Sequence, residues 1–147
     1  MQKLLIISCS NAKLKDIKPI PAMELYDGIN YKVIKKLKRE GKFPKNLDVI
    51  IISAKYGFLE PDDLIEYYNQ KMNKKRALEL HDDILQKFKV FLQDKSYNEV
   101  LVNLGTEYVM AIEGFEKLFD KNTKIAYTTG GIGQKTSEMK DWILSIK

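Results

Sequence analysis

Short apolar runs alternate along the chain with longer segments whose apolar residues recur at helical spacing. The short runs predict four strands, at residues 2–8, 47–55, 98–105 and 123–130. The second run is nearly continuous in isoleucine, which is typical of a parallel strand covered on both faces. The longer segments predict four helices, at residues 29–39, 73–93, 108–119 and 136–146.

This alternation of strands and helices predicts the fold class. It favours right-handed crossovers and a mainly parallel sheet with helices on both faces. We therefore predict an α/β fold, a three-layer sandwich with a mainly parallel four-stranded sheet. The 147 residues contain no repeat or linker, so we expect a single α/β domain over residues 1–147.

Composition and cysteine usage narrow the cellular setting. No apolar run reaches the roughly 18 residues of a membrane span, and the first residues lack the features of a signal peptide. A lone cysteine forms no internal disulfide. We expect a cytoplasmic protein with no membrane partner. One histidine, and acids without ligand spacing, predict neither a metal nor a cofactor.

The positive charge is unevenly distributed. The net charge is +5, and residues 32–45 hold seven lysines and arginines against one acid. A nucleic-acid backbone is one possible partner of this segment, through Lys32, Lys35, Lys36 and Arg39. A solvated helix face is the simpler interpretation.

Polar segments follow all four predicted strands. Ligands of open parallel sheets bind beyond the carboxyl ends of the strands. The segments at those ends read SCSNAK, SAKYGFLEPDD, LGTEY and TTGGIGQKTS. We therefore expect one ligand site at this edge.

The first of these segments contains the only cysteine, Cys9, followed by Ser10 and Lys13. Cys9 is either a small buried hydrophobe or a thiolate that Lys13 stabilises. A nucleophilic cysteine usually has a histidine base. The only histidine, His81, lies in a predicted helix, so we expect it to pack or face solvent rather than to act in catalysis.

The second segment offers Ser53 and Lys55 to a phosphate or a base edge, with Tyr56 available to stack on a ring. A plain turn with an exposed lysine is an equally good interpretation.

The fourth segment is rich in glycine. Backbone N–H groups near Gly130, Gly131, Gly133 and Gln134 could wrap a phosphate. The spacing fits neither the Walker A motif nor the dinucleotide fingerprint.

Two further residues complete the predicted site. Glu66 lies beside Tyr67 and Tyr68, a setting suited to an acid or base, and Thr106 lies at a strand end.

Five motifs in order resemble the Domain of Unknown Function 6884 family of bacteria, archaea and phages. They are SCSNAK, ELYDG, SAKYGFL, IEYYN and GGIGQK. The positions that match the family pattern are Ser8, Cys9, Lys13, Leu25, Tyr26, Gly28, Ser53, Ala54, Lys55, Tyr56, Gly57, Glu66, Tyr68, Gly131, Ile132, Gly133 and Gln134. Tyr67 and Asn69 depart from it, standing where the family has proline and aspartate. We therefore assign no catalytic role to Asn69.

The family is more distantly similar to the peroxide-stress protein YaaA and to the core domain of archaeosine synthase. These resemblances imply a uracil-DNA-glycosylase-like fold and a nucleic-acid or modified-base context.

Together these features predict a nucleotide- or nucleic-acid-binding domain that acts as an enzyme on a nucleobase or its N-glycosidic bond. Lys13 and Lys55 would hold phosphate, and Tyr26, Tyr56 or Tyr68 would stack on the base. Catalysis would involve Cys9, Lys13 and Glu66. The alternatives are a non-catalytic, stress-related DNA- or RNA-binding protein that uses the basic helix, and a small-nucleotide hydrolase or sensor.

Overall fold

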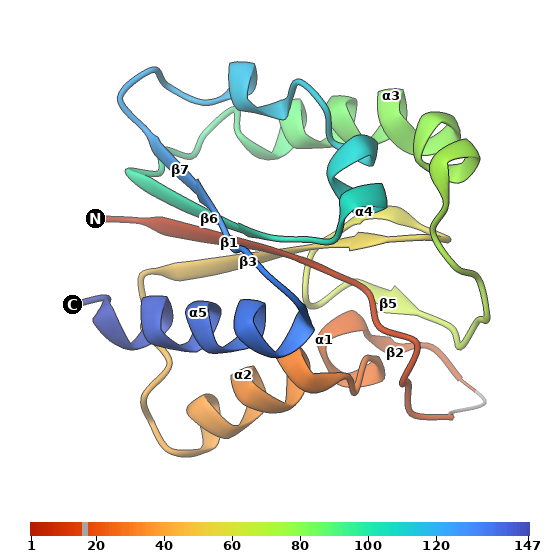
Figure 1. Ribbon diagram of the computed structural model, residues 1–147, viewed down its shortest axis with the longest axis horizontal. Coiled ribbons are helices and arrows are strands. Elements are labelled where there is room, and N and C mark those ends of the chain that lie inside the picture. Colours follow the sequence, from red (N-terminus) through yellow and green to blue (C-terminus); the bar gives the residue numbers. More distant parts are fainter. Residues whose placement is uncertain (16–17) are drawn as a thin grey trace.

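A five-stranded sheet, in the order β4-β3-β1-β6-β7, organises the molecule (Figure 1). The structure is a computed structural model that describes residues 1–15 and 18–147. The strands are β1 (Lys3–Ser8), β3 (Leu47–Ser53), β4 (Gly57–Leu59), β6 (Glu99–Asn103) and β7 (Lys124–Tyr127). All neighbours pair in parallel except β4, which runs antiparallel to β3.

Helices cover both faces of this sheet (Figure 1). One layer holds α2 (Ile29–Arg39) and α5 (Ile132–Ser145). The other holds α3 (Lys74–Phe91), α4 (Thr106–Ala111) and the 3₁₀ helix η1 (Phe115–Leu118). The mixed α/β architecture is therefore as predicted.

A group of short elements lies beside the carboxyl ends of the parallel strands (Figure 1). It consists of the short helix α1 (Ala22–Leu25) and a two-stranded antiparallel sheet of β2 (Ile20–Pro21) and β5 (Leu64–Ile65). Each of these elements is too short to show a hydrophobic period, so the sequence pattern does not predict them.

The central strand β1 joins two hydrophobic cores. Leu5 and Ile7 pack into the core beneath α2 and α5, whereas Leu4 and Ile6 pack into the core beneath α3 and α4. All four side chains are fully buried. This two-sided burial explains why the strand reads as a continuous apolar run.

The prediction of four strands is wrong, because the sheet has a fifth, β4. Gly57 has a positive φ of 75°, which lets the chain reverse directly after β3 and pair back on it. The strand has only three residues, so the chain carries almost no alternating pattern there.

Two predicted helices have different bounds in the structure. The predicted helix 108–119 is divided at Gly114, whose φ is +88°, into α4 and η1. Helix α5 begins at Ile132, four residues earlier than its apolar stripe indicates. No helix in the described part of the chain is long and apolar enough to cross a membrane.

The only histidine, His81, joins α3 to the turn after α4. Its Nε2 lies 2.6 Å from the carbonyl oxygen of Glu113, and its Nδ1 lies 3.0 Å from the Asp82 carboxylate. The hydrogen bond to Glu113 raises the pKa of His81, and the hydrogen bond to Asp82 adds to this effect. The placement agrees with the expected structural role.

The raised pKa of His81 predicts a pH-dependent contribution to stability. The stabilisation should be complete below the unfolded-state pKa of about 6.5 and should be lost as pH rises through the higher folded-state pKa. Thermal unfolding of the wild type and of His81→Gln, scanned across pH, measures this. The melting temperatures should differ most in acid and converge in alkali. A difference that grows with pH would contradict the assignment.

Candidate functional site

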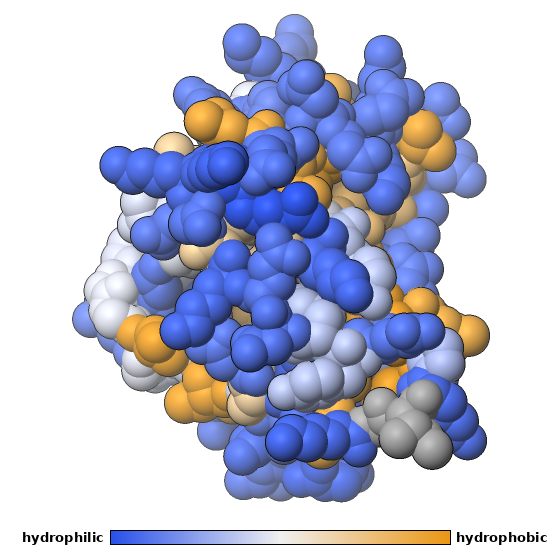
Figure 2. Space-filling view, turned by 90° about the vertical axis from the view of Figure 1, so that its right-hand side faces the viewer, coloured by the Kyte–Doolittle hydropathy of each residue, from blue (hydrophilic) through white to orange (hydrophobic). Residues whose placement is uncertain are grey.

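The loops after β1 and β3 meet at the carboxyl edge of the sheet, on the face of the molecule drawn in Figure 2, which is largely hydrophilic. The Cys9 N–H donates to the Ile52 carbonyl at 2.9 Å, extending the parallel pairing by one residue. The Cys9 sulfur lies 3.0 Å from the Tyr108 hydroxyl and accepts the Ala54 N–H at 3.4 Å. Cys9 is only 9% exposed. The thiol is therefore held between helix α4 and the loop after β3 by hydrogen-bonding groups.

A buried cluster of hydroxyl groups supports this edge. The Tyr68 hydroxyl lies 2.6 Å from that of Tyr26 and 2.8 Å from the Ser53 oxygen. Ser53 in turn accepts the N–H groups of Lys55 and Tyr56 at 3.1 and 3.0 Å. Burial raises the pKa of both Tyr26 and Tyr68 well above its ordinary value, so both remain neutral. The cluster fixes the turn after β3.

Two lysines lie close to the ring of Tyr68. The Lys13 ammonium is 4.5 Å from the ring centroid and the Lys55 ammonium is 5.9 Å from it. Among the residues that the structure describes, neither lysine forms a salt bridge. Burial lowers the pKa of Lys13, while the nearby Cys9 acts in the opposite direction. We call these two residues the lysine pair.

Both loops that carry the lysine pair are fixed by backbone contacts. Leu14 donates its N–H to Leu25 at 2.8 Å, and Asp27 donates to Ala12 at the same distance. These bonds tie the first loop to α1. On the second loop, Arg76 of α3 donates to the carbonyls of Ala54 and Lys55 at 2.7 and 2.8 Å. The ammonium groups therefore extend from anchored segments.

The glycine segment after β7 is closed by its own side chains. The Glu138 carboxylate accepts hydrogen bonds at 2.9 Å from the Thr129 N–H, the Thr129 hydroxyl and the Gln134 amide. These hydrogen bonds lower the pKa of Glu138, and the one from Gln134 has the largest effect. Gly130 has a φ of +82°, and a Cβ there would lie 2.5 Å from Gln134. Glycine and glutamine are thus required by this turn itself.

The predicted aromatic contacts need correction. Tyr26 is fully buried and Tyr68 is 6% exposed, so neither ring can stack on a base. Tyr56 is half-buried, and it packs edge-on against Tyr68 with ring centroids 5.5 Å apart. Of these three tyrosines, Tyr56 is the one whose ring a ligand can reach.

Three other predicted site residues, Ser10, Glu66 and Thr106, either stabilise a loop or are exposed to solvent. Ser10 accepts the Gly28 N–H at 3.2 Å and donates to the Ala12 carbonyl, so it closes the first loop. Glu66 contacts the Tyr56 hydroxyl only through its backbone, and its exposed side chain lacks the expected enclosed setting. Thr106 is exposed at the start of α4.

The predicted basic surface on α2 is smaller than expected. Lys35 donates to the carbonyls of Tyr26 and Glu24 at 2.8 and 3.3 Å and lies 3.7 Å from the Asp27 carboxylate. It therefore serves the end of α1. The other three predicted residues, Lys32, Lys36 and Arg39, are exposed.

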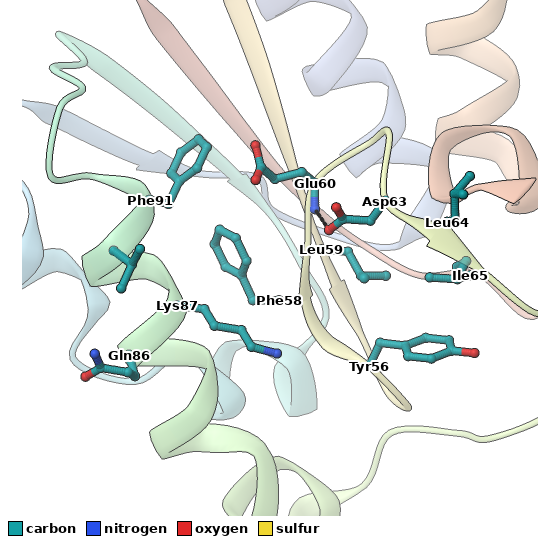
Figure 3. A pocket seen from close by; sticks show the side chains of 11 residues that line it. Tyr56, Phe58, Leu59, Glu60, Asp63, Leu64, Ile65, Gln86, Lys87 and Phe91 are labelled. Atoms are coloured by element: carbon teal, nitrogen blue, oxygen red, sulfur yellow. Dashed lines mark hydrogen bonds between the residues drawn. The ribbon is translucent and has the colours of Figure 1, made fainter. Parts of the chain in front are cut away.

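A cavity of about 560 Å³ lies between β4, β5 and α3. Phe58, Leu59, Ile65 and Phe91 give it a largely apolar lining, whereas the Tyr56 side chain extends away from Phe58 and Phe91 (Figure 3). Of the predicted site residues, only Tyr56 borders it.

Sequence reasoning missed two residues of this site, Tyr108 and Arg76. Tyr108 follows the third predicted strand, so its place in the segment LGTEY was the available signal. Arg76 belongs to a basic stretch on α3 and offered no comparable signal. Among the described residues, no three histidine, cysteine or carboxylate groups lie together as metal ligands would.

The fold and the polar carboxyl edge define an α/β protein with a candidate ligand site at the usual place for this class. Residues 4–141 match the family described as Family of unknown function (DUF6884), so the chain belongs to that family. Among solved structures, the chain is similar to the crystal structure of AF0587, a protein of unknown function, with a TM-score of 0.56 and 14% sequence identity. The match covers 99% of this chain but only 45% of the other, and shows the fold alone. No curated protein matches the chain.

The hydroxyl cluster predicts a stability effect. Ser53→Ala removes the acceptor of two N–H groups and the partner of Tyr68, so the free energy of unfolding should fall by about 1–3 kcal/mol. Urea unfolding measures this loss. Ser137→Ala, at an exposed position on α5, is the control and should change stability little. Equal stability of the two variants would contradict the role of Ser53.

Proposed function

We propose that the chain binds a nucleotide, free or within a nucleic acid, at the carboxyl edge of the sheet. The observation that carries this proposal is the lysine pair. Two ammonium groups lie near one tyrosine ring with no carboxylate partner among the described residues. A phosphate group, with its negative charge and several acceptor oxygens, suits two such donors.

The surroundings of the lysine pair suit the rest of a nucleotide. Tyr56 is half-buried beside Lys55, whose ammonium lies 5.2 Å from its ring centroid. An aromatic ring next to a cation can stack on a base while the cation holds the phosphate. The family's distant resemblances imply a nucleic-acid or modified-base context and a uracil-DNA-glycosylase-like fold. A nucleotide ligand would suit both.

We further propose that the protein is an enzyme that acts on the base or its N-glycosidic bond. Cys9 and Lys13 are the candidate reacting groups, because both lie at the edge that would hold the ligand. Tyr108 and the Ala54 N–H are placed to stabilise charge on the sulfur. Burial lowers the pKa of Lys13, which favours proton transfer by this amine.

The second candidate is non-catalytic nucleic-acid binding through the basic helix α2. Lys32, Lys36 and Arg39 remain exposed there. In a crossover helix, however, the chain runs back towards the amino ends of the strands. The end of α2 that carries Lys36 and Arg39 therefore lies away from the lysine pair. Binding by this surface would be independent of the carboxyl edge.

Calorimetric titration with nucleoside monophosphates tests the lysine pair. Lys13→Ala and Lys55→Ala should each weaken binding by roughly tenfold or more, because each removes a charged hydrogen-bond donor. Lys89→Ala, at an exposed position on α3, should leave the affinity unchanged. If only polymers bind, with a steep salt dependence that both site variants keep, the basic helix is the functional surface instead.

Chromatographic assay of base release tests the enzymatic part. Incubation with nucleotides and short single strands should liberate a base, and Cys9→Ala should abolish release while ligand binding persists. Release that continues at the wild-type rate in Cys9→Ala would exclude the thiol as a reacting group.

A further inference from the structure

A second, smaller cavity of about 210 Å³ opens between the carboxyl ends of β1 and β6. The loop after β1 leads, through β2 and α1, to α2 on one face of the sheet, and the loop after β6 leads to α4 on the other (Figure 1). The two loops therefore diverge at this point. Such a switch in direction is where open α/β sheets form ligand crevices.

Two asparagines line this cavity, and both have their carbonyl oxygens occupied. Asn30 accepts the Thr136 hydroxyl at 2.7 Å, and Asn103 accepts the Thr128 hydroxyl at 2.9 Å. These bonds orient each amide so that its NH₂ group is the end available to a ligand.

Asn103 is 3% exposed, and in the described part of the chain its NH₂ group has one hydrogen-bond partner, the Met139 sulfur at 3.4 Å. A thioether is a weak acceptor, so this buried donor is poorly satisfied without a ligand.

The rest of the lining also favours an acceptor. Lys135 reaches the cavity and uses one ammonium proton on the Leu104 carbonyl, at 2.9 Å. Within residues 1–15 and 18–147, no aspartate or glutamate lines the space. A group that presents oxygen acceptors therefore meets donors, and a group that presents N–H donors does not.

Two positions of the wall are glycines, and both are N-caps, of α4 and α5, where glycine is a favoured residue. Gly105 and Gly131 border the cavity, and their φ angles of −76° and −79° are open to any residue. A Cβ added at either position would meet nothing within 4 Å. The missing side chains leave room along the cavity wall.

We propose that this cavity, rather than the ring of Tyr56, binds the base of the nucleotide, and that it selects a ring carrying carbonyl oxygens over one carrying amino groups. Its volume is below the roughly 300–1,000 Å³ of pockets that hold whole drug-sized ligands, so it suits a single ring system. Ser8 lines it and directly precedes Cys9, whose sulfur contacts the residue before Lys55. The cavity thus adjoins the edge that holds the lysine pair, and this inference rests on the function proposed above.

Two matched ligand pairs test the selection by calorimetry. UMP and CMP differ by a carbonyl against an amino group, and so do IMP and AMP. We expect UMP and IMP to bind roughly tenfold or more tightly than their amino counterparts, the difference made by one good hydrogen bond to a buried donor. Ribose 5-phosphate, which has no base, should bind weakly and equally to the variants below.

Two variants locate the selection. Asn103→Asp replaces the buried NH₂ donor by a carboxylate oxygen, and Gly131→Ala adds a methyl group at the wall. Both should remove the preference for UMP over CMP. Asn122→Asp, at an exposed turn, should keep it. Gly131→Ala keeps the inference testable even if Asn103→Asp fails to fold.

The outcomes separate this inference from the proposed function. Equal affinity for UMP and CMP, weakened in Lys13→Ala and Lys55→Ala but kept in Asn103→Asp and Gly131→Ala, would overturn the base cavity and leave the nucleotide site. Binding of free uracil that depends on Asn103, with no effect of the lysine pair on any nucleotide, would support the cavity and overturn the proposed phosphate site. If no nucleotide, base or sugar phosphate binds, both are overturned.

Discussion

The parallel pairing of β1 with both of its neighbours is the constraint on which the rest of the structure depends. Its four central side chains are fully buried, so the strand must lie inside the sheet with a helical layer on each face. Parallel pairing on both sides then places the loops after β1, β3 and β6 at one edge. The candidate site is a direct consequence of this arrangement.

The polar groups at this edge divide into those that hold the structure and those that remain available. Tyr26, Tyr68 and Ser53 satisfy one another in the interior, as burial of polar groups demands. Thr129, Gln134 and Glu138 do the same at the glycine turn. The available groups are the lysine pair on one side of Cys9 and the amide donors of the small cavity on the other.

This division has a chemical consequence. The lysine pair carries positive charge and the amide groups of the small cavity donate hydrogen bonds, whereas the oxygens of both asparagines accept hydrogen bonds from threonines. The ligand that we propose for this site matches these groups, because it is rich in oxygen acceptors, with an anionic group at one end and a carbonyl-bearing ring at the other.

Much of the fold could be predicted from the sequence, because long periodic elements dominate it. Helix α2 has the predicted bounds, and four of the five strands lie where apolar runs placed them. The approach of Cys9 to the loop that holds Lys55 followed from the parallel order alone. The short β4 and the break at Gly114 could not be predicted, since three or four residues carry no usable period.

Side-chain roles at the site were harder to predict than its position. The sequence could not distinguish an exposed tyrosine from a buried one, so Tyr26 and Tyr68 were expected to stack on a ligand although both are enclosed. Asn30 and Asn103 belong to no recognisable motif, because the orientation of their amides depends on threonines that lie 106 and 25 residues away in the chain, respectively. Such pairings are set by tertiary packing.

A crystal structure of the protein with UMP bound would test the central claim most directly. The account predicts the phosphate within hydrogen-bond distance of the Lys13 and Lys55 ammonium groups, and the ring in the cavity beside Asn103. A nucleotide bound at another surface, with both sites empty, would contradict it.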